Sequence, residues 1–288
     1  MRKGIILAGG NGTRLYPLTR VVSKQLLHVY DKPMIYYPLS ILMFSNIREI
    51  LIISTPHQIP QYRELLGDGS DLGLKLVYQE QEAPRGLPEA FILAEDFLQG
   101  KPSVLILGDN IFFGAGLPPT LEKISLDQEG MGIFSYPVQD PREYGVVEVD
   151  SNNKIISIEE KPKIPKSNFA LTGLYFCDHQ APAFAKALKP SSRGELEIID
   201  LMHQYHKINQ LKVHPFGRGV AWLDTGNPDS LLDASNFVAT IERRQGFKIA
   251  CLEEIALHKQ WIDREILKKT ALNYKNSVYG KYLSTLLG

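Results

Sequence analysis

A glycine-rich loop followed by two basic residues is the part of the sequence best suited to bind an anion. The loop Gly9-Gly10-Asn11-Gly12-Thr13-Arg14 follows a short apolar run, and Lys24 comes soon after it. Glycines let the backbone approach a ligand closely and point several N–H groups at one anion. An arginine fork and a lysine point charge together suit a polyphosphate. For the glycines alone, a tight surface turn is the alternative.

This loop differs from two common nucleotide-binding loops. Leu15 stands where a dinucleotide-binding fingerprint has its third glycine, which argues against an NAD-dependent oxidoreductase. No Gly-Lys-Ser/Thr sequence follows at the spacing of a Walker A loop. The sequence therefore indicates a phosphate-binding loop of another kind.

Two aspartates that come after apolar runs could hold a divalent metal. Asp109 follows the run 104–108, and Asp224 follows the run 220–223. Two carboxylates delivered by strand ends can clamp one Mg²⁺, which takes few protein ligands and several phosphate oxygens. Either aspartate alone could instead cap a helix or a turn. The pair, taken with the glycine loop, favours the metal site at the carboxyl edge of a sheet.

The elements that must position these residues follow from the apolar pattern. Short β-rich runs with little polar alternation predict strands buried on both faces of a sheet, and helical candidates lie between them. This order predicts an α/β fold with a mixed, mostly parallel central sheet flanked by helices. The expected strands are 4–8, 50–54, 74–78, 104–108, 133–138, 145–149, 154–158, 171–176 and 219–223. The expected helices are 34–44, 59–66, 87–97, 182–188, 197–207 and 230–245, with a helical tail over 253–287.

Composition excludes several classes of protein. The 288 residues are 44% hydrophobic and 22% charged, which is typical of a globular chain. Lys plus Arg and Asp plus Glu each number 32, so bulk charge provides no affinity for nucleic acid or for a membrane surface. Cys177 and Cys251 cannot form a disulfide framework, and no signal peptide or membrane span is evident. We expect a cytoplasmic protein with neither nucleic acid nor membrane as partner.

The residues around the glycine loop form part of a longer motif that resembles a known family. Residues 7–19, 24–27 and 31–34 are similar to the signature of sugar nucleotidyltransferases, also called sugar-nucleotide pyrophosphorylases. Further matches extend over nearly residues 1–262, and within the family they resemble the members that use dTTP and glucose 1-phosphate. The matches include Gly108-Asp109-Asn110, Tyr144-Gly145, Glu159-Glu160-Lys161-Pro162, Thr172-Gly173-Leu174-Tyr175, Arg193-Gly194-Glu195 and Trp222-Leu223-Asp224.

The resemblance implies a fold and a reaction. The fold would be a Rossmann-like nucleotidyltransferase core over 1–240, with interleaved nucleotide-binding and sugar-binding parts. A helical C-terminal segment, 241–288, would make subunit or regulatory contacts in a homotetramer. The reaction would be Mg²⁺-dependent transfer from dTTP to α-D-glucose 1-phosphate, giving dTDP-glucose and diphosphate for deoxysugar synthesis such as the dTDP-L-rhamnose pathway.

The resemblance also implies a role for each site residue. The catalytic residues would be Arg14, Lys24 and Lys161, and the metal ligands would be Asp109 and Asp224. The nucleotide-binding residues would be Gly9, Gly10, Gly12, Thr13, Gln25, Gln81 and Gly86. The sugar-phosphate side would be lined by Leu87, Gly145, Glu160, Lys161, Thr172, Tyr175, Arg193 and Trp222. Without the motif, Lys161 would be interpreted as a solvated surface charge, and the aromatic residues as core.

By the same resemblance, base recognition would fall to Gln81 and to the backbone at Gly86, with Gln25 nearby. A glutamine amide offers both a donor and an acceptor, which suits a pyrimidine edge. A hydrophobic pocket discriminates one methyl group by only about 1–3 kcal/mol, so we expect substantial activity with UTP as well. A pyrophosphorylase for UTP or another sugar 1-phosphate is one alternative. A catalytically silent nucleotide-sugar sensor is another, which the retention of Arg14, Lys24, Asp109, Lys161 and Asp224 opposes.

Several positions depart from the family pattern. His28 replaces a usual proline, Pro88-Glu89 replaces a common Ala-Gln, and Leu171 replaces a valine beside the sugar. The resemblance implies a second, regulatory site between subunits that binds a dTDP-sugar end product. Departures in the regions that would form this site put such regulation in doubt. These departures are Phe113, Pro118, Pro119 and Leu252.

Overall fold

The central sheet of the molecule begins with four parallel strands. The computed structural model describes residues 1–10 and 12–288, and Asn11 of the glycine loop lies outside these residues. The parallel strands lie in the order β6 (Ser103–Leu107), β1 (Lys3–Leu7), β4 (Glu49–Ser54) and β5 (Lys75–Glu80). Each matches a predicted strand to within about two residues. Both faces of this part are covered, which explains the lack of polar alternation.

The sheet continues from β6 with antiparallel pairs. β11 (Phe169–Cys177) pairs antiparallel with β6, and it also pairs with β8 and β9. The remaining strands are β8 (Met131–Pro137), β9 (Gly145–Val149), β10 (Ile155–Glu160) and β12 (Leu211–Pro215). The sequence analysis does not predict β12, whose half-exposed edge position leaves it without an apolar run. The predicted mixed α/β fold is confirmed.

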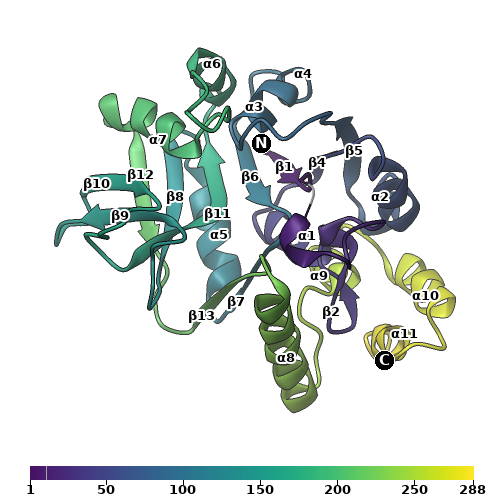
Figure 1. Cartoon of the computed structure of the whole chain (residues 1–288). Coiled ribbons are helices and arrows are strands. Elements are labelled where there is room, and N and C mark those ends of the chain that lie inside the picture. Colours follow the sequence, from purple (N-terminus) through teal and green to yellow (C-terminus); the bar gives the residue numbers. More distant parts are fainter. Residues whose placement is uncertain (11) are drawn as a thin grey trace.

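Two hydrophobic clusters pack on opposite faces of this sheet, between its strands and the helices that Figure 1 shows around them. Adjacent residues of one strand point to opposite faces, so Ile6 enters one cluster and Ile5 the other. The Ile6 face is covered by α1 (Tyr36–Phe44), α5 (Leu117–Leu126) and α9 (Leu252–His258). The Ile5 face is covered by α3 (Glu89–Leu93), α6 (Ala181–Ala187) and α7 (Ile198–Lys207).

The helices follow the prediction with two differences. The predicted helix 87–97 is divided at Ala94 into α3 and α4 (Glu95–Leu98). The sequence analysis does not predict α5, which begins with Leu117-Pro118-Pro119; proline is tolerated in a first helical turn. The other helices are α2 (Ile59–Leu66), α8 (Pro228–Gln245), α10 (Arg264–Asn273) and α11 (Val278–Thr285). No helix in the described part of the chain is long and apolar enough to cross a membrane.

A small separate sheet corrects one expectation about the metal ligands. β7 (Asn110–Gly114) pairs antiparallel with β13 (Val220–Asp224), and Asp224 lies opposite Asn110 in the register. The sequence analysis predicts that Asp224 ends a strand of the central sheet, and this is wrong. Asp224 instead ends β13 of the separate two-stranded sheet. The antiparallel register of this two-stranded sheet is what brings Asp224 next to the turn that carries Asp109.

The C-terminal segment packs on the core. α9 contacts α1, and Leu267 and Leu283 of α10 and α11 belong to the same cluster as Ile41 and Leu42. Figure 1 shows α10 and α11, in yellow, at the end of the molecule that holds α2. The contacts that 241–288 makes with other subunits stay a prediction.

A buried charge network joins the first forty residues to the last fifty. Glu242 accepts hydrogen bonds from Lys32 Nζ at 2.8 Å, from Lys248 Nζ at 2.6 Å and from the Ile249 amide at 2.9 Å. Asp31 completes the network by pairing with both lysines. The Lys32 and Glu242 side chains are each only 2% exposed, so these charges depend on one another for solvation.

Removing one member of this network should destabilise the protein strongly. We expect Glu242→Gln to lower the free energy of unfolding by roughly 3–5 kcal/mol, because it leaves the buried ammonium groups of Lys32 and Lys248 to share the single carboxylate of Asp31. Urea unfolding followed by circular dichroism measures the change. The matched control is Glu95→Gln, which breaks the ion pair between Glu95 and Lys186. Both of these side chains are 48% exposed, so the substitution should cost about 0–1 kcal/mol. Equal effects of the two substitutions would contradict the assignment.

Candidate functional site

The glycine loop takes a backbone conformation that only glycine adopts easily. Gly10 and Gly12 have φ values of 99° and 56°, in the left-handed region. Thr19 Oγ1 donates to the Gly12 carbonyl at 2.7 Å and holds the end of the loop. The loop follows β1 directly, so it lies beyond the carboxyl end of a parallel strand, where ligands of such sheets bind.

A hollow of about 200 Å³ brings the predicted phosphate-binding residues together. Arg14 and Lys24 supply positive charge on its wall, and Asp109 supplies a carboxylate. Lys24 donates a hydrogen bond to Asp109 Oδ2, and Lys24 is only 8% exposed. The lining consists of Gly9, Gly10, Gly12, Thr13, Arg14, Lys24, Gln25, Asp109 and Gly226. All of these except Gly226 are residues or motif positions that the sequence analysis singles out.

Asp109 is fixed by its neighbours on the two-stranded sheet. Asn110 Nδ2 donates to Asp109 Oδ1 at 3.0 Å. The Asp109 carbonyl accepts from Thr225 Oγ1 at 3.0 Å and from the Thr225 amide at 3.3 Å. Asn110 Oδ1 is in turn held by the Gly173 amide at 3.1 Å and by Trp222 Nε1 at 2.6 Å. The carboxylate is thus held in place on several sides.

Asp224 lies close to both Asp109 and Arg14. A Cβ added at Gly226 would meet Asp224 Oδ2 at 3.3 Å and Arg14 Nη2 at 3.3 Å, which places these groups side by side over the glycine. Burial raises the pKa of the Asp224 carboxyl, and the Asp109 carboxylate raises it further. Lys24 and Arg14 act in the opposite direction. Two carboxylates that repel each other beside a phosphate-binding loop are a donor set that fits Mg²⁺.

The predicted sugar side lies next to Asp224 and Asp109. A Cβ at Gly145 would meet Leu171 at 3.2 Å and Glu160 Oε2 at 3.4 Å, so glycine makes room for both side chains. Burial raises the pKa of the Tyr175 hydroxyl, with further contributions from nearby carboxylates that include Glu160 and Asp109. The Tyr175 side chain is buried in the hydrophobic cluster of the Ile5 face.

The other predicted sugar-side residues differ in their exposure and in the contacts that they already make. Lys161 is exposed and has a positive φ of 42°, which is strained for a side chain other than glycine. Arg193 Nη2 pairs with Glu197 Oε2 at 2.7 Å and lies 3.9 Å from Glu160 Oε1, so two carboxylates already share its charge. Thr172 Oγ1 is buried without a hydrogen-bond partner among the described residues. Trp222 packs edge-on against Tyr144 and Tyr136.

The predicted base-reading residues are buried beside the loop. Gln25 Oε1 accepts from Ser23 Oγ at 2.8 Å, and Gln81 Nε2 donates to Glu89 Oε2 at 2.6 Å. Gly86 forms a parallel bridge to Leu196, just before α7. A Cβ at Gly86 would lie 2.0 Å from the Leu196 carbonyl, so only glycine fits there. This bridge joins the predicted nucleotide side to the sugar side, where Leu87 follows.

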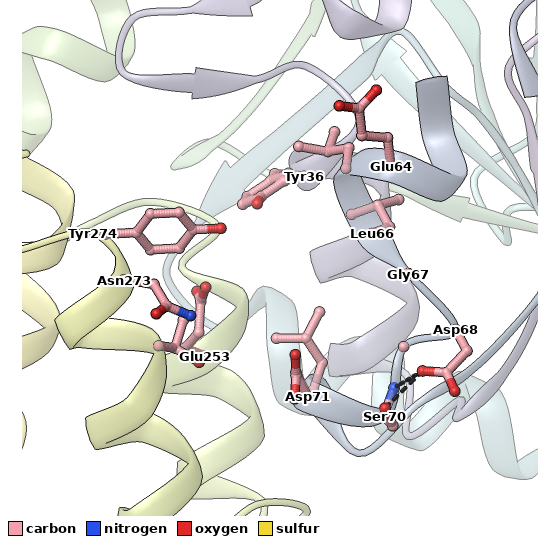
Figure 2. A pocket seen from close by; sticks show the side chains of 14 residues that line it. Tyr36, Glu64, Leu66, Gly67, Asp68, Ser70, Asp71, Glu253, Asn273 and Tyr274 are labelled. Atoms are coloured by element: carbon pink, nitrogen blue, oxygen red, sulfur yellow. Dashed lines mark hydrogen bonds between the residues drawn. The ribbon is translucent and has the colours of Figure 1, made fainter. Parts of the chain in front are cut away.

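A second hollow, of about 240 Å³, lies elsewhere and has the wrong charge for a triphosphate. Figure 2 shows Tyr36, Tyr274 and Glu253 on one side of it and Asp68 and Asp71 on the other. Its described lining holds four carboxylate side chains and no lysine, arginine or histidine. None of the predicted site residues lines it, which favours the glycine-loop hollow as the functional site.

Comparison with known proteins gives the family of this chain. The sequence profile described as "Nucleotidyl transferase" matches residues 3–241. The chain belongs to the nucleotidyl transferase family. A glucose-1-phosphate thymidylyltransferase of Xanthomonas campestris pv. campestris is 55% identical, with 99% of this chain and 97% of the relative covered. The corresponding protein of Neisseria gonorrhoeae is 53% identical, with 99% of each chain covered.

Solved structures give the same family and fold. A Bacillus anthracis structure with bound sucrose, named as a glucose-1-phosphate thymidylyltransferase, is 39% identical with a TM-score of 0.77. It covers 87% of this chain and 98% of its own. A UDP-glucose pyrophosphorylase complexed with UDP-glucose has a TM-score of 0.73 at 22% identity, which supports the nucleotidyl transferase fold alone.

Sequence reasoning about this nucleotidyl transferase misses three residues that shape the site. Asn110 and Thr225 hold Asp109, and Tyr144 approaches Asp224 Oδ1 with its hydroxyl at 3.4 Å. All three stand next to or within motifs that the sequence analysis quotes, so their positions carried a signal. Their roles depend on hydrogen bonds between β7, β13 and the segment before β9, which no sequence pattern reports.

The departures from the family pattern lie in different settings. Phe113 packs edge-on against Phe237 of α8 at 6.0 Å between ring centroids, and Leu252 is 1% exposed at the start of α9. Pro118 and Pro119 lie in the first turn of α5, and His28 is exposed on the short strand β2 (His28–Val29). Whether these departures affect end-product regulation is not tested by their positions in the fold.

Replacing Asp224 by Asn should stabilise the nucleotidyl transferase at about pH 8 when divalent cations are removed. Because folding raises the pKa of Asp224, its ionised form disfavours the folded state above that pKa, and this cost disappears as the pH falls through the raised pKa toward 3.8. We expect a Tm a few degrees above that of the unsubstituted protein, with the difference shrinking in acid. Asp233→Asn, at an exposed position of α8, is the control. A lower Tm for Asp224→Asn at pH 8 would refute this account of the site.

Proposed function

We propose that this chain is a glucose-1-phosphate thymidylyltransferase. An oxygen of α-D-glucose 1-phosphate would attack the α-phosphorus of dTTP, the bond to the β-phosphate would break, and dTDP-glucose and diphosphate would form. The observation that carries the proposal is the cluster of Asp109, Asp224, Lys24 and Arg14 around the glycine loop. The relatives that match nearly the full length are named for this reaction.

Positioning and charge neutralisation are the main requirements of such a transfer, because both substrates are anions. Arg14 and the loop amides would bind the triphosphate oxygens. Lys24, which pairs with Asp109, would turn part of its hydrogen bonding toward phosphate once the aspartates have another cation to share. These residues would hold the α-phosphorus in line with the incoming oxygen.

Asp109 and Asp224 would hold Mg²⁺, since hard carboxylate oxygens are its preferred ligands. Mg²⁺ bound there would neutralise charge that develops on the phosphate oxygens. Burial and, after it, the Asp109 carboxylate raise the pKa of Asp224, and a bound cation would offset both effects, which supports this assignment. Among the described residues no cluster of three or more His, Cys, Asp or Glu forms, so phosphate oxygens and water would complete the coordination.

The sugar phosphate would bind beside Lys161 and Glu160, on the predicted sugar side. Lys161 would contact the phosphate and Glu160 the sugar hydroxyls, with Gly145 leaving room for the Glu160 and Leu171 side chains. The strained backbone of Lys161 supports a functional role, since strain is often found at functional sites. The Lys161 amide also donates to the Tyr144 carbonyl at 3.0 Å, and the Tyr144 hydroxyl lies 3.4 Å from Asp224 Oδ1. The lysine is thereby linked to the metal side.

We further propose a homotetramer, in keeping with exposed apolar residues such as Leu272 and Val278, which are 60% and 69% exposed.

Release of diphosphate from purified protein tests the proposed function. The assay contains Mg²⁺ and glucose 1-phosphate and compares dTTP, UTP, CTP, ATP and GTP. We expect the highest rate with dTTP and the next with UTP, because one methyl group is worth about 1–3 kcal/mol. A folded protein that binds dTTP and releases no diphosphate would instead be a nucleotide-sugar sensor. A clear preference for another triphosphate would replace the proposed substrate.

Loss of either aspartate should abolish most of the activity. We expect Asp109→Asn and Asp224→Asn each to lower kcat by at least about 100-fold, because the divalent cation would lose one of two protein ligands. Steady-state kinetics across a range of Mg²⁺ concentrations measures the effect. Asp233→Asn should leave kcat unchanged. Full activity of either site variant would show that the metal lies elsewhere.

A further inference from the structure

The guanidinium of Arg193 is held by a two-point contact with Glu197. Arg193 Nη2 donates to Glu197 Oε2 at 2.7 Å, and Arg193 Nε donates to Glu197 Oε1 at 3.2 Å. Two parallel bonds of this kind fix the plane of a guanidinium as well as its position. The Arg193 side chain is 49% exposed, so without Glu197 it would sample many rotamers.

Glu197 is itself held in place and ionised. Ser191 Oγ donates to Glu197 Oε1 at 2.6 Å and also accepts from the Arg193 amide at 3.2 Å. Burial acts to raise the pKa of Glu197, but hydrogen bonds from Ser191 and Arg193 lower it below its ordinary value. The preceding residue is fixed as well, because the Leu196 amide donates to the Arg85 carbonyl at 2.8 Å. Glu197 is therefore a rigid, charged support for Arg193.

The Glu197 carboxylate does not stabilise the helix that follows it. Glu197 is the N-cap residue of α7, yet its side chain makes no capping hydrogen bond. Arg193 and Glu197 are four residues apart, but α7 begins only at Ile198, so they are not a pair within one helix. Half-exposed ion pairs contribute little to stability. Neither structural role explains why the carboxylate turns toward Arg193.

The opposite edge of Arg193 faces the predicted sugar side. Arg193 Nη2 lies 3.9 Å from Glu160 Oε1. Among the described residues, the hydrogen bonds of this guanidinium come from Nε and Nη2, and Nη1 makes none. Burial raises the pKa of Glu160, while the positive charges of Lys161 and Arg193 act to lower it, so both cations lie close to Glu160. The N–H groups that Glu197 leaves unused thus lie where the sugar phosphate is expected.

We propose that Glu197 is a positioning residue that holds Arg193 in the orientation in which it binds the phosphate of the sugar substrate. Glu197 occupies the Nε edge and leaves the Nη1 edge to phosphate oxygens. A guanidinium that is oriented before binding loses less conformational freedom when the phosphate arrives. Glu197 itself does not contact the substrate. The inference rests on the proposed function, since it names the residue through which Arg193 serves that reaction.

The first test is Glu197→Gln, which keeps one acceptor oxygen and turns an N–H₂ group toward an arginine donor. We expect the KM for glucose 1-phosphate to rise about tenfold and the KM for dTTP to stay within about twofold. Glu195→Gln is the matched control, because it removes a negative charge from the same turn without touching the contact; both KM values should stay within about twofold. A carboxylate that merely competed with phosphate for Arg193 would give the opposite sign. An unchanged or lower KM for glucose 1-phosphate in Glu197→Gln would overturn the proposal.

A double-mutant cycle tests whether Glu197 acts through Arg193. In an Arg193→Ala background there is no guanidinium left to hold, so Glu197→Gln should change the KM for glucose 1-phosphate by less than about twofold. A tenfold rise in both backgrounds would show that Glu197 acts by another route, and the proposal would be wrong.

Glu197→Asp separates positioning from support of the helix. Aspartate is a favoured N-cap residue, so the Tm should stay the same or rise. Its shorter side chain cannot keep both bonds to Arg193 in its present place, so the KM for glucose 1-phosphate should still rise. A KM fully restored by aspartate would contradict the proposal.

Ser191→Ala serves if Glu197→Gln fails to fold. It removes the hydroxyl that holds Glu197 Oε1 and should raise the same KM by about threefold. An unchanged KM in Ser191→Ala would then count against the proposal.

The two proposals fail in different ways. If the unsubstituted protein releases no diphosphate from dTTP and glucose 1-phosphate, the proposed function is wrong. If it does and Glu197→Gln leaves the KM for glucose 1-phosphate unchanged, the proposed function stands and the inference about Glu197 is wrong.

Discussion

The repulsion between two carboxylates is the constraint on which the rest of this site depends. Asp109 and Asp224 lie near each other in a partly buried place, and the raised pKa of Asp224 reports the cost. Such an arrangement persists only because the surrounding structure holds it. Asn110, Thr225 and Lys24 fix Asp109, while Arg14 lies against Asp224 above Gly226. A bound cation would lower the electrostatic repulsion between these two carboxylates.

The fold meets this constraint by using two kinds of sheet. The parallel strands β6, β1 and β4 set the glycine loop at the edge where nucleotides bind. The separate β7–β13 pair then carries the second aspartate back to the same edge. Residues of β9, β10 and β11, which we propose to line the sugar side, belong to the antiparallel part of the large sheet. In this proposal the nucleotide and sugar sides are interleaved along the chain.

Much of this was predictable from the sequence, for identifiable reasons. Apolar runs such as that of β1 are typical of buried strands, and the Gly9–Arg14 motif has few other uses. The partnership of Asp109 and Asp224 was predictable, but the strand pairing that joins them was not, because the short apolar run 111–113 of β7 does not indicate which strand it pairs with. The orientation of Gln81 also escaped prediction. It depends on Glu89, whose contact across a loop leaves no periodic pattern, and the structure alone supplies it.

The Lys32–Glu242 pair has a consequence for how the protein forms during synthesis. Lys32 leaves the ribosome long before Glu242 and Lys248, yet its ammonium group is buried against them in the finished molecule. Lys32 belongs to the hairpin of β2 and β3 (Lys32–Pro33), which follows Lys24 and Gln25. Until the last fifty residues emerge, Lys32 has only Asp31 of the two carboxylates that pair with it in the finished molecule. The N-terminal strands can pair early, but this hairpin must wait. A nascent chain therefore carries an incomplete site until its translation is almost finished.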